Sequence, residues 1–160
     1  AVSCRQTRGH DTCGDTDRGA ETMNENRKER RLKVLVIDDS SFIRRLTRAI
    51  FEDLGFEVST AEDGPEGARL GLEGPFDVVV VDGVLPGLSG PEVCRQLSSL
   101  PPERRPIIIL QSISMKGYTA RSQALSAGAD AYFEKEALST SMVAWVRETL
   151  TARELAASAA

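Results

Sequence analysis

The run VVVV at residues 78–81 constrains the fold more than any other stretch of this chain. β-branched side chains lose rotamer freedom in a helix and pack well on a pleated strand, so the run predicts extended backbone. Four such residues in a row leave no polar face, and the strand must therefore be covered on both sides. Strands of this kind belong to parallel sheets that lie between two layers of helices. Asp82, which follows at once, then stands at the end of a buried strand.

The rest of the chain alternates short apolar runs with stretches of helical periodicity. Strands are expected at 33–37, 56–61, 77–82, 106–112 and 131–135. Helices are expected at 41–54, 65–72, 90–100, 119–128 and 139–150, the first with an apolar face of Phe42, Ile43, Leu46, Ile50 and Leu54. This order predicts an α/β fold: an open five-stranded parallel sheet with helices on both faces, the (βα)5 doubly wound, flavodoxin-like arrangement.

Three parts of the chain differ in composition. Residues 1–31 hold almost no apolar side chains and are expected to form a disordered leader, because burial there cannot offset the entropy of ordering. Residues 32–150 carry the whole strand and helix pattern and are expected to form one domain. Residues 151–160 are expected to be a C-terminal tail or the start of a linker. The chain begins with Ala1 rather than methionine, which leaves open whether it is a fragment.

Composition excludes several classes of function. The net charge of −4 argues against direct nucleic-acid binding. The longest apolar run is far shorter than the roughly 20 residues that a membrane-spanning helix needs, so no membrane insertion is expected. Three cysteines suit neither a disulfide framework nor a four-ligand zinc site, and a reducing, cytoplasmic location is expected.

Polar residues follow the predicted strands at the end where doubly wound folds carry their chemistry. They are Asp38 and Asp39 after the first strand, Asp82 after the third, Gln111 and Ser112 at the fourth, and Lys135 at the fifth. Taken singly, each has an ordinary explanation as a helix cap, a turn residue or a solvated rim residue. Their convergence at one edge of one sheet predicts a site.

Three neighbouring carboxylates repel one another, and a hard divalent cation relieves that repulsion. Mg²⁺ prefers oxygen ligands and helps to organise an incoming phosphoryl group. A carboxylate beside it can act as a nucleophile and form an aspartyl phosphate, which is the role expected of Asp82. Lys135 is a flexible point charge that can pair with a carboxylate or with a phosphoryl oxygen.

The segments VLVIDDS, VVVVDGVLPGLSGPEV, PIIIL and GADAYFEK resemble the receiver domain of two-component response regulators, over about residues 33 to 150. The resemblance implies that Asp82 is the phosphoacceptor and that Asp39 is a more direct Mg²⁺ ligand than its neighbour Asp38. It also implies a metal-binding backbone carbonyl at Val84. Two further residues take their roles from the same resemblance: Lys135 contacts the phosphoryl group, and Tyr132 is an aromatic switch residue.

Two positions depart from the family pattern. Receiver domains usually have Thr or Ser at the end of the fourth strand, where this chain has Gln111 followed by Ser112; either side chain can contact the phosphoryl group, and we favour Ser112. The stretch QSISMKG is similar to the receiver of the chemotaxis methylesterase. The second departure is Glu136, which follows Lys135 where the family commonly has proline.

The expected function is that of a phosphoacceptor domain, a signalling switch rather than an enzyme. Its partners would be a histidine kinase or phosphotransfer protein, and a downstream protein bound through the fourth helix, fifth strand and fifth helix; homodimer formation stays open. Because Val84 and Ile113 are apolar where such domains flank the hydrolytic water, we expect slow self-dephosphorylation. One alternative is a degenerate receiver that serves only as an interaction module. An aspartate-nucleophile phosphatase would need a second acid where Val84 stands.

Overall fold

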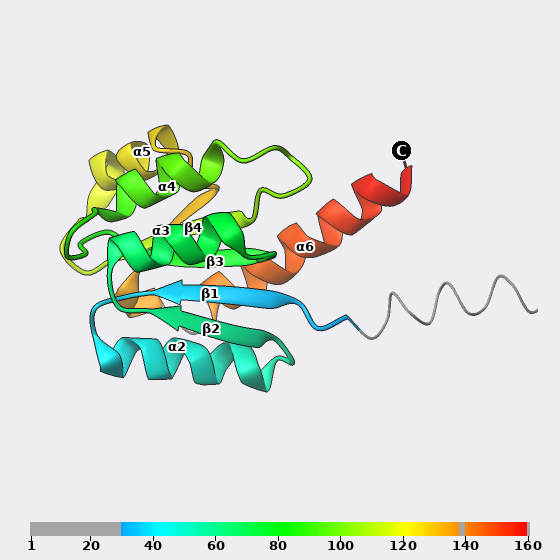
Figure 1. Cartoon of the computed structure of the whole chain (residues 1–160), viewed down its shortest axis with the longest axis horizontal. Coiled ribbons are helices and arrows are strands. Elements are labelled where there is room, and N and C mark those ends of the chain that lie inside the picture. Colours follow the sequence, from blue (N-terminus) through cyan, green and yellow to red (C-terminus); the bar gives the residue numbers. More distant parts are fainter. Residues whose placement is uncertain (1–29, 138–139, 160) are drawn as a thin grey trace, which may run out of the picture. The chain divides into compact units, whose positions relative to one another are not determined.

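The computed structural model describes residues 30–137 and 140–159, so the expected leader lies almost wholly outside the described residues. Strands and helices alternate as predicted along the described chain (Figure 1). The elements are β1 Lys33–Ile37, α2 Ser41–Asp53, β2 Glu57–Ala61, α3 Gly64–Glu73, β3 Val78–Asp82, α4 Gly90–Ser98, β4 Ile107–Ser112, α5 Gly117–Ser126, β5 Ala131–Glu134, the 3-10 turn η1 Lys135–Ala137, and α6 Ser141–Ala159.

The five strands form one parallel sheet in the order β2-β1-β3-β4-β5. This confirms the predicted doubly wound architecture. The chain moves outward from β1 in one direction to β2 and in the other to β3, β4 and β5, so the switch in strand order lies between β1 and β3. In open α/β sheets, the crevice for ligands opens beyond the carboxyl ends of the strands at this switch.

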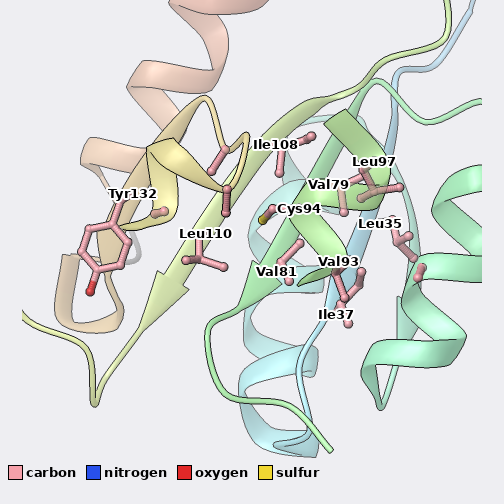
Figure 2. Close-up of a cluster of buried hydrophobic side chains, with 14 of the residues drawn as sticks. Leu35, Ile37, Val79, Val81, Val93, Cys94, Leu97, Ile108, Leu110 and Tyr132 are labelled. Carbon is pink, nitrogen blue, oxygen red and sulfur yellow. The ribbon is translucent and has the colours of Figure 1, made fainter. Parts of the chain in front are cut away.

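Each strand contributes alternate side chains to two separate hydrophobic cores. Val79 and Val81 point toward α3, α4 and α5, where Cys94 and Leu97 pack against them (Figure 2). Val78 and Val80 point the other way, into a cluster closed by α2 and α6. All four valines are fully buried. The VVVV run is therefore the centre of the sheet, as its composition predicts.

Helix ends follow the local sequence rules. Ser40 is the N-cap of α2, where its hydroxyl accepts a hydrogen bond from the Ile43 amide at 3.4 Å. Gly55 and Gly128 follow α2 and α5 with φ of 88° and 100°, a left-handed conformation that glycine adopts without strain. These short connections lead from the helix ends into the starts of β2 and β5, at the edge of the sheet opposite the carboxyl ends of the strands.

The buried face of α2 differs from the expected one. Phe42 is 65% exposed and Leu46 is exposed as well, whereas Thr47 and Phe51 are buried. The side chains of Ile43, Thr47 and Phe51 lie on one helical face, and Phe42 and Leu46 lie about a quarter-turn away. The apolar spacing therefore predicted the helix correctly and its buried stripe only in part.

The last helix is longer than expected. Although the sequence pattern ended it near residue 150, α6 runs to Ala159, with its last turns beyond the sheet (Figure 1). Residues 151–159, TARELAASA, are rich in strong helix formers and contain neither glycine nor proline. Within the described parts of the chain, no helix is long and apolar enough to cross a lipid bilayer.

Candidate functional site

The first carboxylate of the site, Asp38, follows β1 and is fully buried. Its backbone extends the β1–β2 pairing, since the Asp38 amide donates to the carbonyl of Ala61 at 3.2 Å. The Ser40 amide donates to Oδ1 of Asp38 at 2.9 Å, and Arg44 Nη1 donates to the Asp38 carbonyl at 2.7 Å. The turn into α2 thus fixes both the backbone and one carboxylate oxygen of Asp38.

The second carboxylate, Asp82, ends β3 and is 6% exposed. The Val84 amide donates to its Oδ1 at 3.4 Å. Gly90, which begins α4, lies so close that an added Cβ would stand 2.2 Å from the Asp82 carbonyl oxygen. The close approach explains a glycine at this point of the LPGLSG motif, because any side chain there would push α4 away from the strand end.

Lys135, directly after β5, joins the two carboxylates. Its Nζ lies 2.6 Å from Oδ2 of Asp38 and 3.2 Å from Oδ2 of Asp82. Because β4 lies between β5 and β3, the lysine side chain passes the end of β4 to reach them. All three groups are buried, so the ion pairs are only weakly screened by solvent.

The electrostatics of the site favour a cation. Burial raises the pKa of Asp82, and the charge of Asp38 raises it further, although Lys135 acts in the opposite direction. Burial alone would lower the pKa of Lys135, but its hydrogen bond to Asp38 and the charges of both carboxylates outweigh this and raise it. Lys135 therefore stays protonated. Its single positive charge is shared between the carboxylates of Asp38 and Asp82, and a further cation would be attracted to the pair.

A third carboxylate completes a candidate metal site. One oxygen each from Asp38, Asp39 and Asp82 can be grouped so that all three lie within 4.8 Å of one another. Asp38 and Asp82 are buried, whereas Asp39 is exposed at the mouth of the group. An all-oxygen donor set, open on one side to water, suits Mg²⁺, which usually keeps several of its waters.

The side chains of Ser112 and Tyr132 both form hydrogen bonds with the backbone of one loop residue, Met115. The Ser112 hydroxyl accepts a hydrogen bond from the Met115 amide at 3.2 Å, and the Tyr132 hydroxyl donates to the Met115 carbonyl. The Tyr132 ring lies at one end of the hydrophobic cluster, with its oxygen pointing away from the cluster (Figure 2). Burial, followed by the charge of Glu134, raises the pKa of Tyr132, so its hydroxyl keeps the donated proton.

The same loop has a third tie on the surface. Lys116 Nζ lies 3.1 Å from Oε1 of Glu136, and both side chains are largely exposed. Glu136, at the position where the family commonly has proline, thus forms an ion pair with Lys116 of this loop. The described residues contain no cis peptide bond, as expected for a chain without proline there.

Gln111 is paired in register with Asp82 on the neighbouring strand, and both are buried. Its Nε2 and Oε1 have no hydrogen-bond partner within the described part of the chain. A buried polar group without a partner costs roughly 1–3 kcal/mol, so this amide is poorly satisfied in the unliganded protein.

Two contacts that hold the strand ends in place are not evident from the sequence. Arg44 holds the Asp38 carbonyl, although it reads as one of several arginines on the polar face of α2. Asp130 accepts the Ile108 amide at 2.8 Å and an Arg105 Nη1 hydrogen at 3.1 Å, and so fixes the start of β5 against β4. Asp130 belongs to the GADAYFEK segment, which marks it as a residue of interest, but the segment alone does not show that Asp130 binds Ile108 and Arg105.

Fold and site together define a class: a doubly wound parallel α/β protein with a cluster of carboxylates and a lysine at the carboxyl edge of its sheet. The family model described as the response regulator receiver domain matches residues 34–147. The chain belongs to this family, which confirms the resemblance and identifies a signalling domain of two-component systems.

Individual relatives agree with this assignment. The transcriptional regulatory protein ResD of Bacillus subtilis (strain 168) is 40% identical over 104 residues, which cover 64% of this chain and 41% of that protein. A protein-glutamate methylesterase/protein-glutamine glutaminase of Geobacter metallireducens is 36% identical over 110 residues, 68% of this chain and 30% of that protein. The chain thus spans less than half the length of each of these relatives.

Solved structures show the same fold. A CheY-like response regulator receiver domain protein from Methanospirillum hungatei JF-1 superposes with a TM-score of 0.71 at 26% identity. The superposition covers 78% of this chain and 98% of that one. The architecture is therefore that of a whole receiver domain.

Proposed function

We propose that this receiver domain accepts a phosphoryl group on Asp82 from a histidine kinase or a phosphotransfer protein. An oxygen of the Asp82 carboxylate attacks phosphorus on the donor's phosphohistidine. The new O–P bond forms as the N–P bond breaks, and the electron pair of that bond returns to the donor imidazole. The observation that carries the proposal is Lys135 held between Asp38 and Asp82, beside an oxygen cluster suited to a divalent cation.

Each residue has a definite task in this proposal. Asp38, Asp39, Asp82 and the backbone carbonyl of Val84 would hold Mg²⁺, which when bound offsets the negative charge of the incoming phosphoryl oxygens. Lys135, already positioned by both buried carboxylates, would turn part of its charge toward the phosphoryl group. Burial of Asp82 keeps bulk water from competing as the acceptor.

The output would be a change in the face formed by α5, β5 and α6, to which a downstream protein binds. Support comes from the loop between β4 and α5, which Ser112 and Tyr132 hold through the backbone of Met115. A charge added at Asp82 acts next to the strand that carries Ser112. We expect this exchange to take place in the cytoplasm, where a free thiol such as that of Cys94 persists.

The proposal is tested by incubation with Mg²⁺ and a small phosphoryl donor such as acetyl phosphate, followed by mass spectrometry of the intact protein and its peptides. The expected result is one added phosphoryl group, located on Asp82 and absent from Asp82→Asn. Asp53→Asn, which alters an exposed carboxylate of α2, serves as the matched control and should be labelled like the wild type. A label at another residue, or none with either acetyl phosphate or a competent kinase, rules the proposal out.

A further inference from the structure

Arg44 is a charged residue of α2 whose guanidinium turns back toward the candidate metal site instead of out into solvent. Its side chain is only 13% exposed, whereas the next residue of the helix, Arg45, is exposed. Nη1 donates to the backbone carbonyl of Asp38 at 2.7 Å, and Nη2 donates to Oε1 of Glu62 at 3.0 Å. The planar guanidinium thus joins two residues that follow different strands, β1 and β2.

Two general electrostatic effects oppose a cation at this place. Arg44 is the fourth residue of α2, and positive charge in the first turn of a helix is disfavoured by the helix dipole. Arg44 also contacts Asp38, so its charge would repel a divalent cation held by the same group of carboxylates. Through its charge alone, Arg44 would therefore weaken the binding of Mg²⁺.

The hydrogen bond from Arg44 fixes the peptide group that joins Asp38 to Asp39. The other side of Asp38 is held by β2, because the Asp38 amide donates to the carbonyl of Ala61 at 3.2 Å. Among the residues that the structure describes, the carboxylate of Asp39 has no hydrogen bond or ion pair, and it is the exposed member of the acidic group. The direction of the Asp39 carboxylate therefore depends on the backbone that Arg44 holds.

We propose that Arg44 is a positioning residue for the cation: its hydrogen bond to the Asp38 carbonyl directs the Asp39 carboxylate and so raises the affinity for Mg²⁺. The inference rests on the proposed function, in which Asp38, Asp39 and Asp82 hold this cation. Groups that hydrogen-bond to metal-binding residues orient them, and the loss of such a group weakens metal binding about tenfold to a hundredfold. Glu62 holds the other side of the guanidinium and keeps it turned toward Asp38.

Positioning and charge predict opposite changes in Mg²⁺ affinity. Arg44→Met removes both the charge and the hydrogen bonds, so positioning predicts about tenfold weaker binding, whereas charge alone predicts tighter binding. Arg44→Lys keeps the charge, but its single ammonium group cannot bridge both partners as the guanidinium does. The expected order of affinity is therefore wild type first, then Arg44→Lys, then Arg44→Met.

The dissociation constants are measured by nuclear magnetic resonance of the backbone amides as Mg²⁺ is added. The resonances followed are those of the folded protein, so a loss of stability alone does not change the fitted constant. Arg45→Met is the matched control, because it removes the same charge from the adjacent exposed residue and should keep the affinity within about twofold of the wild type. Before Mg²⁺ is added, the Asp39 amide resonance should already shift in Arg44→Met, since that amide belongs to the peptide group that Arg44 binds.

The outcomes separate the inference from the proposed function. If Arg44→Met binds Mg²⁺ as tightly as the wild type or more tightly, or its metal-free Asp39 resonance stays in place, the positioning role is overturned and the phosphoacceptor function stands. Arg44→Lys that binds like the wild type also overturns it, and this comparison holds even where Arg44→Met does not fold. If the wild type itself does not respond to Mg²⁺, the cation site of the proposed function fails and this inference fails with it.

Discussion

Nζ of Lys135 lies 2.6 Å from Oδ2 of Asp38, although the two residues are 97 positions apart in the chain. The contact joins the end of the last strand to the end of the first. It also neutralises a fully buried carboxylate next to a second one, Asp82, which the same lysine reaches at 3.2 Å. In the unphosphorylated protein the charge of Lys135 is therefore directed at these two carboxylates, and the proposed reaction must turn it toward the phosphoryl group.

Removal of that cation should be costly. Lys135→Met leaves two buried carboxylates unpaired and should lower the free energy of unfolding by about 3–5 kcal/mol in metal-free buffer. Urea denaturation followed by circular dichroism measures the change. Lys116→Met is the control, because it breaks only the exposed pair with Glu136 and should leave the free energy of unfolding nearly unchanged. A similar loss of unfolding free energy in the two variants would mean that the buried pairs of Lys135 contribute no more to stability than the exposed pair of Lys116.

Asp82 should destabilise the metal-free protein at neutral pH. Its pKa is raised in the folded chain, chiefly by burial and then by Asp38. Below its ordinary value of 3.8, Asp82 is protonated in both the folded and the unfolded chain, and Asp82→Asn should then match the wild type in stability. As the pH rises above 3.8, the unfolded chain ionises first, so the wild type loses stability relative to the variant until folded Asp82 ionises too.

The comparison is made by urea denaturation of both proteins, in the presence of a chelator, at several values between pH 3 and pH 8. The variant should be the more stable protein at pH 7, with a gap that closes toward acid. A gap that widens toward acid, or a variant less stable than the wild type at pH 7, would show that Lys135 outweighs burial and the charge of Asp38.

Mg²⁺ should stabilise the protein through the exposed member of the cluster. At a concentration one hundred times its dissociation constant, a ligand specific for the folded state adds about 2.7 kcal/mol to the free energy of unfolding. Asp39→Asn should lose most of this gain while its metal-free stability stays close to that of the wild type, because Asp39 is exposed. Thermal melts with and without Mg²⁺ measure the effect, and Asp53→Asn should keep the full gain.

The sequence predicted the sheet and the grouping of three of its strand-end side chains because both depend on strong, redundant signals. A VVVV strand has no polar face and must be buried on both sides. The alternation of strands and helices then indicates a parallel sheet between two layers of helices. The carboxyl ends of parallel strands meet at one edge, so Asp38, Asp82 and Lys135 could be grouped before any distance was known. In the folded chain these three side chains are in direct contact.

Details that turn on a single residue position were not predictable in the same way. Spacing could not tell which face of α2 would be buried, and Phe42 and Leu46 proved exposed. A strand reverses the side-chain direction at every residue, so the choice between Gln111 and Ser112 needed the register with Asp82. The sequence favoured Ser112 for the phosphoryl contact, whereas the register puts the side chain of Gln111 on the face of Asp82.

The lifetime of the aspartyl phosphate should be long, because the side chains at positions 84 and 113 offer nothing to orient water. Val84 and Ile113 are 56% and 53% exposed, and neither has a polar side-chain atom. Hydrolysis needs a water oxygen to bond to phosphorus as the bond to the Asp82 oxygen breaks. Val84→Asn supplies an amide that can hold this water and should speed the loss of phosphate about tenfold, the effect of one hydrogen bond on a barrier.

Decay of the phosphorylated protein, followed by intact mass after the donor is removed, measures this rate. Leu125→Asn makes the same kind of change at an exposed apolar residue of α5, away from the strand ends, and should leave the rate unaltered. A wild-type lifetime of seconds would contradict the argument, since fast hydrolysis would then proceed beside two apolar side chains. An unchanged rate in Val84→Asn would likewise show that residue 84 does not face the attacking water.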